Sequence, residues 1–320
     1  MERLRGRIAV VTGGGTGMGR ELVRQLAEAG CDVATCDVSG ETLVETERLA
    51  LAEATDGARV MTFVADVADE AALTGFRDAV VASFATDHIH LLFNNAGIGG
   101  GGSLVNDDRV EWERTFGVDW GGVYLSTRCF LPLLLAADEG HVINTSSVNG
   151  FWGSLGPTIP HTAYSAAKFA VKGFTEALIT DFRMNAPHLR ASVVMPGHIG
   201  TSIVINSAKA HGTDPETMDD ARLAQFRGRL IARGLPLEGV SDDDLRQGLR
   251  VMGESFRDAA PMTAAEAATV ILAGVKANAW RILVGADAEE LDRAVRAAPE
   301  DAYETGFFEA LQKQGHLGGV

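Results

Sequence analysis

Cysteine, basic charge and long apolar runs are all scarce in this sequence of 320 residues. The three cysteines, Cys31, Cys36 and Cys129, cannot all pair and lack metal-ligand spacing, so we expect no metal site and a reducing cytoplasm. The net charge of −15 argues against nucleic acid or an anionic membrane as the main partner. No apolar run is long enough to span a membrane or to form a signal peptide, so we expect a soluble protein.

Short apolar runs alternate with longer helical patterns along the chain. The runs that predict strands are 7–12, 31–37, 59–66, 89–95, 140–147, 189–196 and 280–285. Helical periodicity covers 18–30, 41–54, 69–85, 108–137, 163–184 and 263–277. This alternation predicts an α/β fold, a Rossmann-type, doubly wound, parallel seven-stranded sheet with helices on both faces. Ligands of such sheets bind at the carboxyl ends of the strands.

The remaining segments extend this single predicted domain, which covers 1–320. Residues 202–260 are acidic and irregular, and they are too many for an ordinary connection. We expect them to form a helical lid insertion before the last helix and strand. Residues 286–320 form a C-terminal extension.

The first predicted strand leads into a helix through the glycine-rich turn TGGGTGMG, Thr12 to Gly19. Glycines let the backbone approach a pyrophosphate, and the helix N-terminus faces its charge. Such turns also occur without any ligand, but the next strand supports the functional interpretation. It ends at Asp37, whose carboxylate suits ribose hydroxyls and repels a 2′-phosphate, with no Arg or Lys beside it. The pattern predicts NAD rather than NADP as the cofactor.

A second motif, AYSAAKFAVKGF at 163–174, places Tyr164 and Lys168 one helical turn apart. Ordinary side-chain pairs at this spacing stabilise a helix only slightly. An ammonium held close to a phenol stabilises the phenolate and lowers the tyrosine pKa. We therefore expect Tyr164 to act as an acid/base group.

Together these motifs resemble the short-chain dehydrogenase/reductase superfamily, single-domain branch. The resemblance rests on the glycine turn, NNAG at 94–97, Ser147, YSAAK at 164–168 and PGHIGT at 196–201. It implies an NAD(P)-dependent enzyme that interconverts an alcohol and a carbonyl, and a homotetramer or homodimer built on the long helices after the fourth and fifth strands. By resemblance, Ser147, Tyr164 and Lys168 are catalytic, and Lys168 also holds the nicotinamide ribose.

Further cofactor-binding positions follow from the same resemblance. Asp66 and Val67 are expected at the adenine, and Asn94 and Gly97 beside the adenosine. Ile199 and Thr201 are expected at the nicotinamide carboxamide and pyrophosphate. Asn95 is expected to be more structural. The full predicted set is Gly13, Thr16, Gly17, Met18, Gly19, Asp37, Asp66, Val67, Asn94, Ala96, Gly97, Tyr164, Lys168, Pro196, Gly197, Ile199 and Thr201.

Two departures separate the chain from the family pattern. Asp119, within DWGGV, stands where the family has a catalytic Asn that stabilises a helix kink and a water leading to the lysine. We count Asp119 among the catalytic residues, with its role in the proton relay open. A carboxylate near Lys168 would hold the ammonium charged and would leave the tyrosine pKa higher than an Asn would. The segment from Ser147 to Tyr164 is also about four residues longer than the family usually shows, and it carries Phe151 and Trp152.

The substrate is inferred from the lid and from this longer loop. Both are rich in apolar side chains, which predicts a roomy apolar pocket for a bulky hydrophobic alcohol or ketone of steroid, terpenoid or aryl type. Alternatively, the apolar lid residues pack the lid's own core or a subunit contact. Candidate substrate contacts are Phe151, Trp152, His161, His198 and Val204.

The sequence thus predicts an NAD-dependent oxidoreductase acting on secondary alcohols or ketones. The alternative is a nicotinamide-binding sensor or scaffold protein in which catalysis is weak or lost. The complete set of Ser147, Tyr164 and Lys168 favours the enzyme, and Asp119 weakly favours the alternative.

Overall fold

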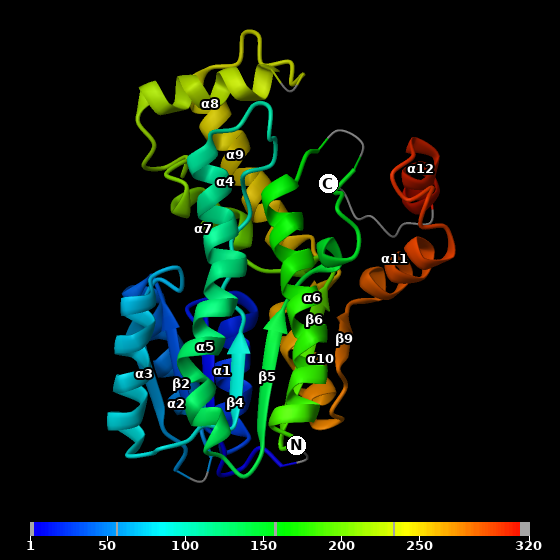
Figure 1. The fold of residues 1–320 in the computed structure, drawn as a ribbon. Helices are drawn as coiled ribbons and strands as arrows, with labels where there is room; N and C mark the ends of the chain where they lie inside the picture. The colour runs from blue at the N-terminus through cyan, green and yellow to red at the C-terminus, as the bar shows by residue number, and fades with distance from the viewer. Residues whose placement is uncertain (1–2, 56, 157–158, 233, 314–320) are drawn as a thin grey trace.

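Seven parallel strands form one sheet in the computed structural model, which describes residues 3–55, 57–156, 159–232 and 234–313 (Figure 1). The strand order is β3-β2-β1-β4-β5-β6-β9, with every neighbouring pair parallel. The strands are β1 (Ile8–Thr12), β2 (Asp32–Asp37), β3 (Val60–Val64), β4 (Leu91–Asn94), β5 (Gly140–Thr145), β6 (Leu189–Pro196) and β9 (Arg281–Val284). The order reverses between β1 and β4, so the predicted doubly wound sheet is confirmed and its ligand crevice lies at this switch point.

Helices cover both faces of the sheet (Figure 1). One face carries α1 (Gly17–Glu28), α2 (Gly40–Glu53) and α10 (Ala264–Lys276), and the other carries α3 (Glu70–Phe84), α5 (Gly122–Leu135) and α6 (Thr162–Asn185). Each face has its own apolar core, because the buried strands present Val, Leu and Ile in both directions. Local capping fixes where some helices begin: Thr263 and Glu266 form a capping box at the start of α10.

The long helix predicted over 108–137 contains a wider π-helical turn. α4 (Arg109–Phe116) runs into η1 (Gly117–Gly121) and then into α5, with helical backbone angles throughout the junction. Glycines stand at 117, 121 and 122 of this junction, and Gly122 is pressed against Val67, where an added Cβ would lie 2.6 Å from a methyl group. Turns of this kind occur mostly at functional sites, and this one carries Asp119.

The predicted lid is helical and rises beyond the carboxyl ends of the strands (Figure 1). It consists of α7 (Ile203–Ala210), α8 (Asp220–Ala232) and α9 (Asp242–Asp258), and its base is closed by the parallel pair β7 (Ile199–Gly200) and β8 (Met262–Thr263). The sequence reading missed this two-stranded sheet because both strands are only two residues long. Many apolar lid residues pack a core of their own, as the alternative interpretation states: Met218, Leu223, Phe226, Leu230, Leu237, Leu245 and Leu249.

The C-terminal extension packs on the loop that follows β5. It contains α11 (Ala286–Ala297) and α12 (Thr305–Lys313). Trp152 is buried beneath it with 2% exposure, stacks on Phe308 at 5.6 Å between ring centroids, and donates from Nε1 to the Ala302 carbonyl at 2.7 Å. The indole of Trp152 therefore helps to anchor the extension to the core domain, together with the pairing of Asp292 with Arg281.

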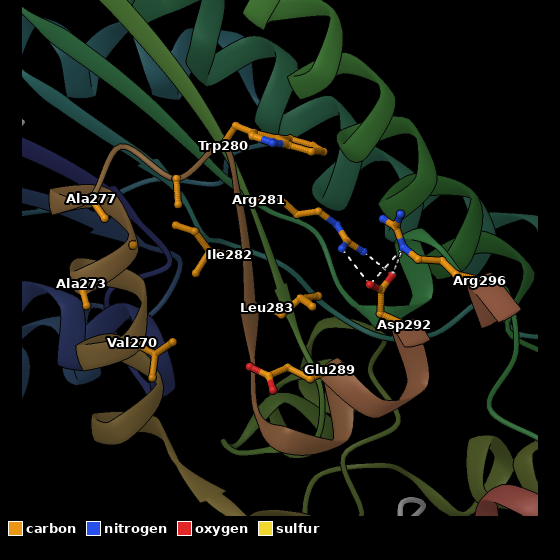
Figure 2. A pocket seen from close by; sticks show the side chains of 12 residues that line it. Val270, Ala273, Ala277, Trp280, Arg281, Ile282, Leu283, Glu289, Asp292 and Arg296 are labelled. Carbon is orange, nitrogen blue, oxygen red and sulfur yellow. Dashed lines mark hydrogen bonds and ion pairs between the residues drawn. The ribbon is translucent and has the colours of Figure 1, made fainter. Parts of the chain in front are cut away.

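A cavity of about 820 Å³ opens along the outer side of the edge strand β9, between α10 and α11 (Figure 2). Arg281 and Arg296 both donate to Asp292 on one side of it. This cavity shares no residue with the crevice at the switch point. Among the helices of the described residues, none is long and apolar enough to cross a membrane.

The packing of Trp152 predicts a large stability effect. Trp152→Ala should lower the free energy of unfolding by about 3–5 kcal/mol, because it removes a buried aromatic ring and a hydrogen bond. Trp280→Ala, at a tryptophan that is 46% exposed, is the matched control and should change it by less than about 1 kcal/mol. Urea unfolding measures both, and proteolysis of the extension should accelerate only in Trp152→Ala. Equal effects of the two substitutions would contradict the anchoring role.

Candidate active site

The glycine-rich turn between β1 and α1 forms the floor of the crevice. Gly13 and Gly17 have positive φ angles of 70° and 55°, which side chains with a Cβ rarely adopt. A Cβ on Gly13 would lie 2.7 Å from the Cα of Ala96, so the turn also needs glycine to sit against the end of β4. The N-terminus of α1 opens directly from this turn and can face an anionic group.

Asp37 stands at the end of β2 beside the turn. Its carboxylate accepts hydrogen bonds from the backbone N–H groups of Gly15 at 3.0 Å and Ser39 at 3.1 Å. Arg20, the basic residue nearest the turn in sequence, donates to the Gly15 carbonyl at 2.5 Å and to Thr46 Oγ1 at 3.0 Å. Its guanidinium is thus occupied by the turn and by α2, which leaves Asp37 as the charged group at this end of the crevice.

The crevice has a volume of about 390 Å³ and contains most of the predicted cofactor-binding positions. Of these positions, its lining includes Gly13, Thr16, Gly17, Met18, Gly19, Asp37, Asp66, Val67, Ala96, Gly97 and Thr201. Sequence reasoning missed a second group: Val38, Ser39, Thr42, Ala65, Asn95, Ile98, Arg114, Val118, Ile203, Asn206, Lys209 and Ala210. Those in α4 and α7 belong to no motif and reach the crevice only through tertiary packing.

The two asparagines after β4 differ from the expectation. Asn94, expected beside the adenosine, is buried and donates to Thr127 Oγ1 at 2.9 Å and Asn144 Oδ1 at 2.7 Å, tying β4 to its neighbours. Asn95, expected to be more structural, lines the crevice and also bonds the glycine turn through the Thr12 carbonyl at 3.2 Å. Of this pair, Asn95 lines the crevice and Asn94 does not.

Three further predicted positions lie outside the crevice lining. Ile199 is buried in the apolar core with 3% exposure. Gly197 follows β6 and lies against Asp287, where a Cβ would come within 2.1 Å of the carboxylate. Pro196 ends β6 in register with Val284 of β9. These residues shape the strand ends beneath the lid.

Ser147, Tyr164 and Lys168 come together above β5. Ser147 follows that strand, and its Oγ accepts a hydrogen bond from Asn149 N at 3.1 Å. The Ser147 hydroxyl is close enough to Tyr164 to lower the pKa of the phenol slightly. Tyr164 and Lys168 project from the first turns of α6, with the lysine Nζ 5.2 Å from the centre of the phenol ring. Lys168 is 2% exposed and donates to the Thr145 carbonyl at 3.2 Å. The predicted trio is thus assembled in space.

Asp119 completes the cluster from the π-helical turn. Its Oδ1 lies 3.0 Å from Lys168 Nζ, and both side chains are almost fully buried. A Cβ on Gly97 would lie 2.5 Å from Asp119 Oδ1 and 3.2 Å from Lys168 Nζ, so this glycine leaves the space in which the ion pair forms. The carboxylate expected near Lys168 thus contacts it directly.

Burial and these neighbouring charges set the ionisation of the cluster. Burial raises the pKa of Asp119 to about 6, although the charge of Lys168 opposes the shift. Burial also raises the pKa of Tyr164, Lys168 lowers it and Asp119 raises it, and the net direction is upward. The expected lowering of the tyrosine pKa is therefore not the net result. Lysine attraction is present, but desolvation and the Asp119 carboxylate outweigh it.

The predicted substrate contacts divide into two groups. His161 lies beside Tyr164, with ring centroids 4.7 Å apart, and burial lowers its pKa to about 4, which keeps it neutral near pH 7. Trp152 is corrected: the C-terminal extension covers its ring, so it has no face for a substrate. Phe151 packs in the same cluster, under the Arg281 guanidinium.

The remaining two candidates contact helix α9 of the lid. His198 Nε2 lies 2.7 Å from the Phe256 carbonyl of α9, and the two rings are 4.3 Å apart. Val204 lies against Gly253, also of α9. No cluster of three or more metal-ligating side chains occurs in the part of the chain that the structure describes.

Comparison with known proteins agrees with this geometry. The family model described as short chain dehydrogenase matches residues 7–212. "Putative oxidoreductase SadH" of Mycobacterium tuberculosis is 36% identical over 271 residues, covering 80% of this chain and 95% of that protein. A protein named 3-alpha-(or 20-beta)-hydroxysteroid dehydrogenase, from Mycobacterium bovis, is 34% identical and covers 62% of this chain and 71% of its own length.

Solved structures show the same fold. A short-chain dehydrogenase/reductase from Burkholderia phymatum in complex with NAD has a TM-score of 0.73 and 27% identity, covering 94% of this chain and 96% of that one. A metagenomic short-chain oxidoreductase in complex with NADP has a TM-score of 0.53 and 31% identity, covering 60% and 83%. With its seven-stranded sheet, its glycine turn and the matched family model, the chain belongs to the short-chain dehydrogenase/reductase family of oxidoreductases.

Proposed function

We propose that this oxidoreductase uses NAD to interconvert a secondary alcohol and a ketone. The observation that carries the proposal is the meeting of Ser147, Tyr164 and Lys168 at the carboxyl end of β5, next to the crevice. A sensor or scaffold protein would need the crevice but not this trio. The alternative therefore leaves the trio unexplained.

The crevice fits a nicotinamide dinucleotide. Its glycine turn leaves no room for a Cβ at Gly13, and the N-terminus of α1 faces the crevice. Asp37 offers a carboxylate at the carboxyl end of β2. These features match a pyrophosphate at the turn and ribose hydroxyls at Asp37. When bound, NAD supplies the hydride acceptor or donor.

The protein's own side chains then have to transfer one proton to or from the substrate. In alcohol oxidation, Tyr164 takes the hydroxyl proton as the phenolate, and in ketone reduction it returns that proton. Ser147 donates a hydrogen bond to the substrate oxygen as negative charge develops on it. Lys168 holds the phenolate electrostatically, and Asp119 keeps Lys168 charged.

We further propose that the substrate is bulky and hydrophobic, of steroid, terpenoid or aryl type. Support comes from the length of the lid, from the desolvated surroundings of Tyr164 and His161, and from the hydroxysteroid activity in the name of one relative. The lid's own apolar core reduces the number of side chains that remain for the substrate. A panel of such alcohols with NAD, followed by NADH absorbance, tests the class.

We also propose a homotetramer or homodimer in the cytoplasm. Aromatic side chains meet on the outer surface of η1, α5 and α6, where Trp120 and Phe174 are 5.3 Å apart and Tyr124 is 43% exposed. Phe169 on α6 is equally exposed. An apolar surface on these two helices suits contact with a second copy.

The proposed cytoplasmic location rests on the cysteines. Three unpaired cysteines suit a reducing compartment.

Replacement of the proton-transfer group tests the mechanism. Tyr164→Phe should lower kcat by roughly 10² to 10⁴, while NADH binding measured by fluorescence persists. Tyr303→Phe, at an exposed tyrosine, is the matched control and should leave kcat unchanged. Near-normal turnover by Tyr164→Phe would mean that another base is at work.

Cofactor choice depends on Asp37. The value of kcat/KM with NAD should exceed the value with NADP by at least about tenfold, because the carboxylate repels a 2′-phosphate. Asp37→Ala should narrow this preference mainly through KM, since the contact is remote from the reacting carbon. Equal use of both cofactors by the unaltered protein would overturn the assignment.

The pH dependence of oxidation tests Asp119. With a pKa of about 6, its carboxyl group is charged across the alkaline range, and that charge raises the pKa of Tyr164. Asp119→Asn removes the charge, so the rising limb of the kcat/KM profile should move to lower pH with turnover within about tenfold of the original. Asp119→Ala should be worse than Asn. Loss of all turnover in Asp119→Asn would make Asp119 itself an essential acid/base group.

A further inference from the structure

Helix α7 of the lid lies across the crevice and is bonded to both of its rims. On the glycine-turn side, Asn206 Nδ2 donates to Thr16 Oγ1 at 2.9 Å. On the side that follows β4, Gly99 N donates to Ser207 Oγ at 2.7 Å, and His211 Nε2 lies 2.8 Å from the Gly99 carbonyl. The helix therefore forms one wall of the crevice rather than a distant cover.

Lys209 lies on the crevice side of this helix. It follows Asn206 by three residues, which is close to one helical turn, and it lines the same crevice together with Asn206 and Ile203. Its side chain is exposed, and it makes no ion pair with any residue that the structure describes. An ammonium held on this wall without a partner has a full charge to offer a ligand.

The other charged residues of the lining do not supply a free cation. Arg114 pairs with Asp66 at 2.7 Å, and Asp37 is itself an acid. A dinucleotide brings two negative charges on its pyrophosphate into a protein whose net charge is −15. The N-terminus of α1 offsets part of this repulsion, and a further positive charge is needed most where the pyrophosphate lies.

We propose that Lys209 is a cofactor-binding residue whose ammonium pairs with the pyrophosphate of the dinucleotide, so that helix α7 of the lid holds the cofactor by charge. The location follows from Asn206: its bond to Thr16 fixes this face of α7 above the glycine turn, where the phosphates are expected. The inference rests on the proposed use of a nicotinamide dinucleotide. It adds a contact from the lid that no motif of the sequence marks.

Binding of NADH and ADP-ribose, measured by titration calorimetry on the full chain, tests this pairing without relying on activity. Lys209→Gln should weaken both ligands about tenfold, the size of a charge-assisted contact, and Lys209→Arg should weaken them far less. The affinity of the unaltered protein should also fall more steeply with added NaCl than that of Lys209→Gln. Lys276→Gln, an exposed lysine on α10 outside both cavities, is the matched control and should change nothing.

Different failures of this experiment have different meanings. If the unaltered chain binds neither NADH nor ADP-ribose, the proposed function itself fails. If it binds both and Lys209→Gln binds them equally well, only the role of Lys209 is overturned. A loss for adenosine monophosphate as large as that for ADP-ribose, or a larger loss for NADPH than for NADH, would place Lys209 at the adenosine end and would also overturn the pairing with pyrophosphate.

Discussion

The buried ion pair between Lys168 and Asp119 is the constraint on which the rest of the site depends. Two charges 3.0 Å apart and out of water are costly to bury unless each keeps the other charged. Around this pair, Gly97 has to lack a side chain, and the helix that carries Asp119 widens into a π-helical turn. The phenol of Tyr164 then experiences an ammonium that favours its ionised form and a carboxylate that opposes it.

Close contacts between backbone segments also shape the crevice. The glycine turn meets the end of β4 at a distance that excludes any Cβ at Gly13, and the lid helix α7 meets the turn again from the other side through Asn206 and Thr16. The crevice is thus bounded by three segments far apart in the sequence. A ligand held there contacts the sheet, the turn and the lid together, which suits an enzyme that excludes water before it moves a proton.

Much of the fold could be predicted from the sequence, because strand alternation and glycine turns are local signals. All seven strands of the main sheet lie within the predicted runs, and Tyr164, Lys168 and Ser147 meet as expected. The features that the sequence did not predict are tertiary contacts between residues far apart in the chain. Nothing in the composition of 202–260 says whether Leu223 faces a substrate or the lid's own core, and nothing near Trp152 indicates that helix α12, far along the chain, covers it. The direct contact of Asp119 with Lys168 likewise depends on how two helices pack.

We propose that Tyr164 is the acid/base group and that Lys168 and Asp119 shift its pKa in opposite directions. NMR titration of the protein labelled at the tyrosine ring measures this directly, because the chain has only three tyrosines and Tyr164→Phe identifies the signal. Without NAD, we expect a Tyr164 pKa above the ordinary value of about 10, and a lower value in Asp119→Asn. A Tyr164 pKa at or below about 10 that Asp119→Asn leaves unchanged would contradict the proposal.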